Sequence, residues 1–241
     1  MMTFSRIELQ PAYVVHTRAY RDTSMLVDFF TPDYGRITAI ARGVRKPKSP
    51  KRSLLNPFLP LLISVQGKSS LKLLTHVEAC TVRAWRLQGE RLFSGLYVNE
   101  LIVRLLPEWD AYHELNADYN VALETLDCEG SVEPVLRKFE SALLQALGYG
   151  VDYSIDAETA EAIKPDGYYC LNPQLGFCVA HVDAGRLLFS GDDILAVAHG
   201  DFQREAICKV AKQINRTLLA PLLGGRPLQS RLLFKGLTAS K

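Results

Sequence analysis

Short apolar and β-branched runs, separated by turn residues, occupy the first 80 positions of the chain. They lie at residues 12–17, 23–31, 36–41, 57–65 and 70–75. Pro32-Asp-Tyr-Gly35 has proline and glycine where tight turns favour them. Five short strands in about 80 residues are typical of a small antiparallel barrel or sandwich. If they close as a Greek key, the result is an OB-fold, a recurrent platform for single-stranded nucleic acid.

The hydrophobic period becomes helical near residue 90. Helices are expected at 91–106, where Pro107 stops the first, and at 115–126, 131–147, 192–198, 204–219 and 230–235. For the third helix, Ser131 is the expected N-cap, Pro134 falls in the first turn and Gly148 is the expected C′ residue. Pro221 is expected to end the helix that begins at residue 204.

Between the helices, residues 150–191 form a segment rich in Asp, Gly, Pro and Tyr. Two short strands are expected there, at 167–171 and 176–180, with Cys170 and Cys178 approaching across the hairpin as core residues. The prediction is therefore an α+β protein. A five-stranded OB-fold-like barrel at 1–82 is followed by a mainly helical domain at 83–241, which includes this short β excursion.

Charge is distributed unevenly, although the net charge is only +2. Residues 1–82 carry +7, residues 83–203 carry −12 and residues 204–241 carry +7. Basic ends around an acidic middle indicate a polyanion-binding end joined to a part with a different task.

Candidate catalytic and metal chemistry is sparse. The chain has no phosphate-binding glycine loop and no nucleophile elbow, and its five cysteines form no Cys-x-x-Cys pair. We therefore expect no enzyme activity, no cofactor and no metal. The cysteine pattern and the lack of a long apolar run favour a cytoplasmic protein without a membrane span. A nuclease using Asp22, Asp28 and Asp33 remains an alternative, although their spacing fits no standard ligand motif.

The clearest functional signal is a basic segment that follows the third expected strand. A flexible loop here suits a phosphate backbone, because clustered cations displace condensed counterions. Aromatic residues interleave nearby, and of these Tyr34 in its turn is the expected exposed base-stacking residue. The predicted DNA-binding residues are Arg36, Arg42, Arg45, Lys46, Lys48, Lys51, Arg52 and Tyr34. The alternative is a solvated surface loop.

Several strings along the chain resemble RecO, the bacterial recombination mediator family. They occur in order over essentially the whole sequence: His16-Thr-Arg-Ala-Tyr-Arg-Asp-Thr-Ser-Met25, Phe58-Leu-Pro-Leu61, Ser94-Gly-Leu-Tyr-Val-Asn-Glu-Leu101, Leu136-Arg-Lys-Phe-Glu140, Leu147-Gly-Tyr-Gly150 and Leu223-Gly-Gly-Arg-Pro-Leu228. Each string is weak alone, and together they are specific.

The resemblance implies an N-terminal OB-fold, a helical C-terminal domain and a place beside the bacterial nucleoid. It implies binding and annealing of single- and double-stranded DNA. The implied partners are RecR and the C-terminal tail of single-stranded DNA-binding protein, with which the family helps load RecA onto coated strands. Some members carry a four-cysteine zinc module, whose cysteine pairs this chain lacks in residues 150–191.

A helix in the acidic middle offers a candidate site for the partner's tail. An acidic tail that ends in an apolar residue needs a cation beside an apolar pocket. The predicted residues are Leu136, Arg137, Lys138 and Phe139, with Arg137 as the carboxylate partner. The alternative is that Leu136 and Phe139 belong to the core and that Arg137 and Lys138 are ordinary surface charges.

Further cations near the C-terminal end could extend the DNA surface. They are Lys209, Lys212, Arg216, Arg226 and Arg231. The main interpretation is a non-enzymatic DNA-binding and annealing mediator of recombination in DNA repair. The alternative is a protein-interaction scaffold whose basic loop binds an acidic partner.

Overall fold

The computed structural model describes residues 5–81, 84–180 and 187–238. The chain divides into two compact units, one of Met1–Gly130 with Pro227–Lys241 and the other of Ser131–Arg226. The last barrel strand ends at Ala79 and the first helix begins at Gly89, whereas the expected domain boundary at residues 82–83 lies outside the described residues and stays a prediction. The first two helices lie in the same compact unit as the strands that precede them.

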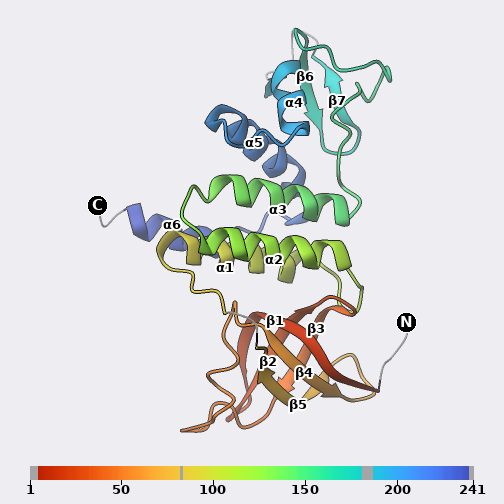
Figure 1. Ribbon diagram of the computed structural model, residues 1–241. Helices are drawn as coiled ribbons and strands as arrows, with labels where there is room; N and C mark the ends of the chain where they lie inside the picture. Colours follow the sequence, from red (N-terminus) through yellow and green to blue (C-terminus); the bar gives the residue numbers. More distant parts are fainter. Residues whose placement is uncertain (1–4, 82–83, 181–186, 239–241) are drawn as a thin grey trace. The chain divides into compact units, whose positions relative to one another are not determined.

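The five N-terminal strands close into a barrel (Figure 1). They are β1 (Arg6–Tyr20), β2 (Ser24–Thr31), β3 (Gly35–Ala41), β4 (Leu61–Gln66) and β5 (Lys72–Ala79), in the order β1-β2-β3-β5-β4. All neighbours are antiparallel except β3 and β5. The first half of β1 pairs with β4 and the second half with β2, so this one strand closes the barrel. The predicted OB-fold-like barrel is confirmed.

Alternating apolar side chains fill the barrel. Val27 and Phe29 from β2 face Ile37 and Ala39 from β3 in one buried cluster. Val44 and Leu55, which come from the connection between β3 and β4, are buried in the same cluster. Leu54 and Leu59 pack against the cluster as well, so the connection is anchored to the core, although most of residues 45–53 are exposed.

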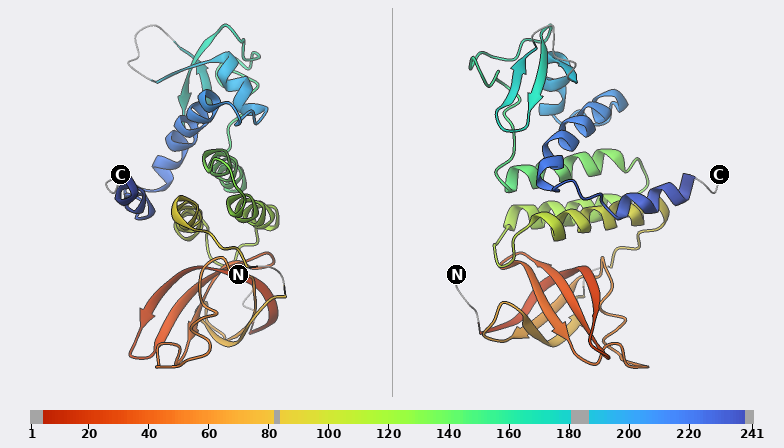
Figure 2. Two further views of the ribbon diagram at one scale, coloured as in Figure 1. Left: turned by 60° about the vertical axis from the view of Figure 1, so that its left-hand side comes forward. Right: turned by 180° about the vertical axis from the view of Figure 1, so that it is seen from behind.

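Three helices accompany the barrel in the first unit (Figures 1 and 2). They are α1 (Gly89–Leu105), α2 (His113–Asp127) and α6 (Ser230–Thr238), and both α2 and α6 pack on α1. The fully buried ring of Tyr119 in α2 contacts two barrel aromatics edge to face, with centroids 5.3 Å from Tyr13 and 5.7 Å from Phe30. Such aromatic contacts stabilise beyond the area they bury, so the barrel and α2 share one core.

The second unit combines helices with a small sheet. Its elements are α3 (Glu133–Ala146), β6 (Tyr168–Asn172), β7 (Gly176–Val179), β8 (Leu188–Ser190), α4 (Gly191–Ala198) and α5 (Glu205–Leu222). The predicted hairpin is present, with Cys170 directly opposite Cys178 and both buried. Burial raises the pKa of the Cys178 thiol to about 11, so this thiol packs as a neutral core group. Strand β8, which pairs with β6, was not expected.

Two helix ends differ from the sequence expectation. The N-cap of α3 is Val132 instead of Ser131, so no side chain caps this helix, although Pro134 does lie in its first turn. Pro221 lies inside the last turn of α5, which continues to Leu222 because the Leu223 N–H still bonds the Leu219 carbonyl across 3.0 Å. Gly148 adopts φ +77° after α3, as expected of a C′ glycine.

Over the described ranges, the helices are too short or too polar to cross a membrane.

Candidate functional site

The basic loop between β3 and β4 is a chain of turns. Backbone N–H groups of Lys46, Ser49 and Arg52 each bond the carbonyl three residues earlier, across 3.2–3.3 Å. Together with the buried anchors Val44 and Leu55, these bonds give an ordered loop where the sequence suggested a flexible one. Its exposed cations are Arg42, Arg45, Lys46, Lys48 and Arg52. Lys51 is half-buried, with Nζ 3.4 Å from the Thr75 carbonyl.

The turn between β1 and β2 is tied to this loop. The backbone N–H of Arg45 donates to the Thr23 carbonyl across 2.9 Å, and its Nη1 donates to the Arg21 carbonyl across 3.0 Å. Met25 pairs with Ala41, which places both connections at the same end of the barrel. We call this end, with residues 18–24 and 42–52, the basic end.

Three residues of the basic end were not among the residues that the sequence predicted to bind DNA: Arg18, Tyr20 and Arg21. Arg18 and Arg21 are exposed, and Tyr20 is partly exposed. The Arg21 guanidinium lies over the Tyr20 ring, 5.3 Å from its centroid. The order of the strands could have predicted them. In an antiparallel meander, the connection between the first two strands and the end of the third strand lie at the same edge.

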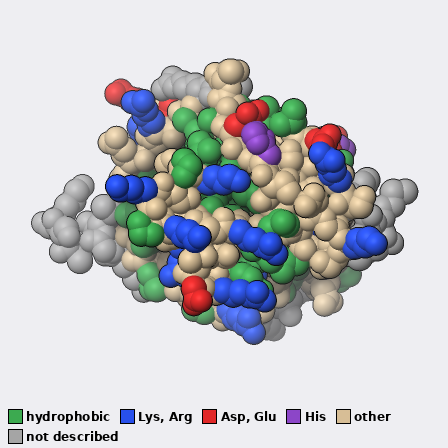
Figure 3. Space-filling view, turned by 90° about the horizontal axis from the view of Figure 1, so that it is seen from below, with side chains coloured by type: hydrophobic (Ala, Val, Ile, Leu, Met, Phe, Trp, Pro, Cys, Tyr) green, Lys and Arg blue, Asp and Glu red, His purple; other side chains and the backbone are tan. Residues whose placement is uncertain are grey.

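The space-filling view from below shows positive charge concentrated on the barrel unit (Figure 3). Seen from below, the face of the barrel unit carries many Lys and Arg side chains and fewer acidic ones. Clustered exposed cations of this kind neutralise phosphates with no need for base contacts.

Tyr34 and Arg36, also predicted to bind DNA, lie at the opposite end of the β2–β3 hairpin. Thr31 pairs with Gly35 there, while Met25 pairs with Ala41 at the basic end. At about 3.3 Å per strand residue, roughly 20 Å separates the two ends. Tyr34 packs against the barrel core. The two residues are therefore not brought together with the basic loop.

Internal polar contacts occupy Arg36. Its Nε donates to the Leu106 carbonyl across 3.0 Å, and its Nη1 lies 3.2 Å from Glu108 Oε1. The side chain is 16% exposed. Because these partners neutralise and cover the guanidinium, the geometry disfavours Arg36 as a phosphate ligand, and its DNA role stays a prediction.

Asp28 is a buried carboxylate beside Arg36 on the neighbouring strand. Burial raises its pKa, but hydrogen bonds with His16 and Thr38 and the charge of Arg18 outweigh burial, so the pKa is lowered overall. Thr38 Oγ1 donates to Asp28 Oδ1 across 2.5 Å, and His16 Nδ1 lies 3.2 Å from Oδ2. Asp28 thus joins β1, β2 and β3 as an ionised acceptor.

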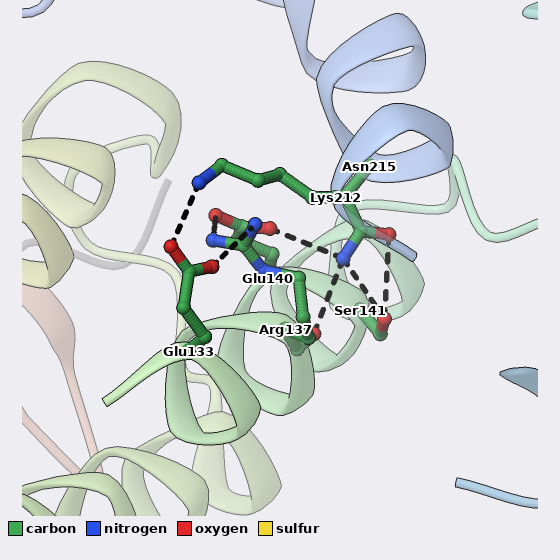
Figure 4. A network of polar contacts seen from close by, with 6 residues as sticks. All are labelled: Glu133, Arg137, Glu140, Ser141, Lys212 and Asn215. Carbon is green, nitrogen blue, oxygen red and sulfur yellow. Dashed lines mark hydrogen bonds and ion pairs between the residues drawn. The ribbon is translucent and has the colours of Figure 1, made fainter. Parts of the chain in front are cut away.

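The predicted tail-binding residues lie on α3 in different environments. Leu136, Arg137 and Phe139 are buried, and Lys138 is exposed. Figure 4 shows Arg137 within a polar network that joins α3 to α5. The alternative assignment of Leu136 and Phe139 to the core matches their burial, whereas Arg137 is a buried charge instead of a surface one.

Buried and exposed carboxylates hold the Arg137 guanidinium. Its Nη2 donates to the buried Glu140 across 2.8 Å, and its Nη1 lies 3.3 Å from Glu133. Glu133 also binds Lys212 Nζ across 2.7 Å, and Asn215 Nδ2 donates to Glu140 across 3.1 Å. The guanidinium therefore pairs with two carboxylates of its own helix, and these carboxylates in turn bind α5. That Arg137 meets a partner's carboxylate stays a prediction, and its burial disfavours it.

A cavity of ≈ 260 Å³ in the same unit is lined partly by α3 residues that lie one helical turn after Lys138. Ser141 and Ala142, three and four residues further along α3, line this cavity and share the helix face of Lys138. The remaining lining residues are Leu144, Gln145, Gly150, Val151, Tyr153 and Leu218. An exposed cation on the helix face that lines a largely apolar cavity is an arrangement that suits an acidic tail with an apolar end.

The C-terminal cations are spread over both units. Lys209, Lys212 and Arg216 follow one face of α5, where Lys209 pairs with Glu205 and Lys212 with Glu133. Arg226 closes the second unit, and Arg231 lies on α6 of the first. Their part in DNA binding stays a prediction.

Metal chemistry finds no support within the described part of the chain, where no three His, Cys, Asp or Glu side chains are placed to hold an ion. Asp28 is committed to its hydrogen bonds, and Asp33 accepts from Gln10 Nε2 across 2.9 Å. Asp22 follows β1 and Asp33 follows β2, at opposite ends of the hairpin. The three carboxylates of the nuclease alternative are therefore not gathered.

Comparison with known proteins agrees with an N-terminal barrel followed by a mainly helical part. The model of the family "Recombination protein O N terminal" matches residues 4–83, and that of "Recombination protein O C terminal" matches residues 86–231. DNA repair protein RecO of Cellvibrio japonicus is 49% identical over 95% of this chain and 97% of its own length. The RecO protein of Pseudoalteromonas atlantica is 45% identical over 92% of each chain. The chain therefore belongs to the RecO family of DNA repair and recombination proteins.

Proposed function

We propose that the protein binds single- and double-stranded DNA through the basic end of its barrel and promotes annealing of complementary strands. The observation that carries the proposal is the ordered loop whose exposed cations Arg42, Arg45, Lys46 and Lys48 stand beside Arg18 and Arg21. An OB-fold barrel commonly binds nucleic acid at the loops that join its strands.

Charge neutralisation supplies the mechanism. Two complementary strands repel one another through their phosphates, and a cationic surface that holds both lowers this repulsion. Binding releases condensed counterions, so both affinity and annealing fall as salt rises. Because the role needs no bond to be made or broken, it calls on neither a catalytic residue nor a cofactor.

A second contact would tether the protein to coated DNA. We propose that Lys138 and the adjoining cavity receive the C-terminal tail of single-stranded DNA-binding protein, with the apolar end in the cavity and a carboxylate at Lys138. Tethering raises the local concentration of the basic end near the strand without new DNA contacts. Together with RecR, this would help RecA load onto the strand, in association with the nucleoid.

A protein-interaction scaffold is the second candidate. The same exposed cations would suit an acidic protein surface. In that case, reversing charges in the loop would impair partner capture and leave DNA affinity unchanged.

Annealing of two complementary oligonucleotides across a salt series tests the main proposal. We expect the rate to fall steeply as salt rises, and to fall at low salt when loop cations are reversed. Annealing that is independent of salt would contradict charge neutralisation. A control reversal at Lys164, an exposed cation of the second unit paired with Glu161, should leave the rate unchanged.

A further inference from the structure

The turn between β1 and β2 holds an aromatic ring among cations. Tyr20, the last residue of β1, is partly exposed, and the Arg21 guanidinium lies over its ring at 5.3 Å from the centroid. Arg21 adopts φ +51°, a left-handed conformation that non-glycine residues seldom take. Arg45 holds the turn in this conformation through its bonds to the carbonyls of Arg21 and Thr23.

We propose that the Tyr20 ring is a stacking platform for one unpaired base and that the Arg21 guanidinium covers the ring in the free protein. A guanidinium and a base are both planar groups that attract the face of an aromatic ring. A backbone conformation that the surroundings must hold in place is a common mark of a binding site. When a strand arrives, the guanidinium exchanges the ring for a phosphate, and a base takes its place.

The other aromatics near the basic loop in the sequence are unsuited to this role. Tyr13 and Phe30 pack on Tyr119, and Phe29 and Phe58 are buried. Tyr34 packs against the core at the far end of the β2–β3 hairpin. Tyr20 is thus the partly exposed aromatic that the described structure places at the basic end.

A stacking platform distinguishes single strands from duplexes. In a duplex the bases are stacked and paired with each other, so only the phosphates reach the cations. An unpaired base can leave its neighbours and lie on the ring. This inference rests on the proposed DNA binding by the basic end, and it adds the residue that favours single strands.

The test compares Tyr20→Leu with Tyr20→Phe in the full-length protein. The probe is an oligo-dT carrying one 2-aminopurine, with a duplex of equal length alongside it. We expect Tyr20→Leu to lower single-strand affinity about 5- to 150-fold, the range typical of removing one stacking interaction with a base. Its salt slope and its duplex affinity should match wild type, because no charge is removed. Tyr20→Phe should bind the single strand like wild type, because a phenyl ring also offers a face on which a base can stack.

Each remaining result has a defined meaning. Equal losses for single strand and duplex, no loss at all, or a Tyr20→Phe variant as weak as Tyr20→Leu would each overturn the platform. A wild-type protein that binds no DNA overturns the proposed function together with the platform, whereas wild-type affinity of Tyr20→Leu for the single strand overturns only the platform. Tyr168→Leu, which removes an exposed ring in the second unit, is the matched control. Thermal unfolding checks that each variant is folded.

Discussion

Arg137 and Glu140 form an ion pair inside the second unit, with Nη2 2.8 Å from Oε1 and side chains only 3% and 4% exposed. The pair belongs to α3, and through Asn215 it also binds α5. Removing one partner of such a pair leaves the other charge buried and uncompensated. The pair therefore makes a stronger demand on fold stability than a surface ion pair would.

Arg137→Met should destabilise the second unit by about 3–5 kcal/mol, because Glu140 then lacks its counter-charge. The double variant Arg137→Met/Glu140→Met should recover much of this loss, since apolar side chains of similar volume often replace a buried pair with little penalty. Urea unfolding of the single and double variants measures both quantities. Losses that simply add would show that the two side chains are not coupled.

Lys138→Glu should weaken binding of an acidic peptide with an apolar C-terminal residue by about tenfold or more, as expected for reversing a charge at a carboxylate contact. DNA affinity should stay unchanged, because Lys138 belongs to neither part of the basic end. Fluorescence anisotropy with a labelled peptide measures the effect. Lys164→Glu, which also reverses an exposed cation of this unit, is the control and should bind the peptide normally. If both variants weakened peptide binding equally, the effect would come from the overall charge of the unit, and Lys138 would have no specific contact with the peptide.

Asp28→Asn should lower the stability of the barrel by about 1–3 kcal/mol at neutral pH, since Asp28 accepts hydrogen bonds in ionised form. The folded pKa of Asp28 is lower than the ordinary value of 3.8. The carboxylate therefore contributes stability above that value, and the contribution is lost as pH falls through the folded pKa. Unfolding measured from neutral to strongly acidic pH should show the two proteins converging at the acidic end. A constant difference would rule out this ionisation as the cause.

Gly35→Ala should destabilise the first unit by about 3 kcal/mol or more. Gly35 has φ +59°, and an added Cβ would lie 1.6 Å from the Asp110 carbonyl oxygen. Gly43→Ala is the matched control, with φ +70° and an added Cβ that would meet only the Lys46 side chain, at 4.0 Å. It should lose only about 1 kcal/mol, for the left-handed backbone. Similar losses in thermal unfolding would mean that backbone strain, and not the close approach, dominates at Gly35.

The apolar pattern predicted most of the elements because their buried side chains recur in the sequence. The apolar run at 23–31 and the loose alternation at 36–41 predict two strands, and the stripe formed by Leu136, Phe139 and Leu143 predicts α3. Strand β8 was missed because it has only three residues, Leu188–Ser190, too few to show a period. Its pairing with β6 depends on a partner elsewhere in the chain.

The candidate site was predicted only in part, since sequence proximity does not give position around a barrel. Arg36 lies close to Arg42 in the sequence, yet a strand carries it to the opposite end. Tyr20 is separated from the loop by strands β2 and β3, but its turn meets the loop through Arg45. A similar limit applied to Arg137, because the carboxylates and the packing of α3 against α5 that bury it are visible only in the folded chain.

Oligo-dT binding across a salt series tests the central claim most directly, with wild type compared to Arg45→Glu/Lys46→Glu/Lys48→Glu. If these cations contact phosphates, wild type should show a steep salt dependence. The logarithmic slope of the triple variant should then be shallower by about 2, since each phosphate of a single strand that is no longer neutralised lowers the slope by roughly 0.7. Equal slopes and affinities in two folded proteins would contradict the account, and would leave the loop to a protein partner and the DNA to another surface.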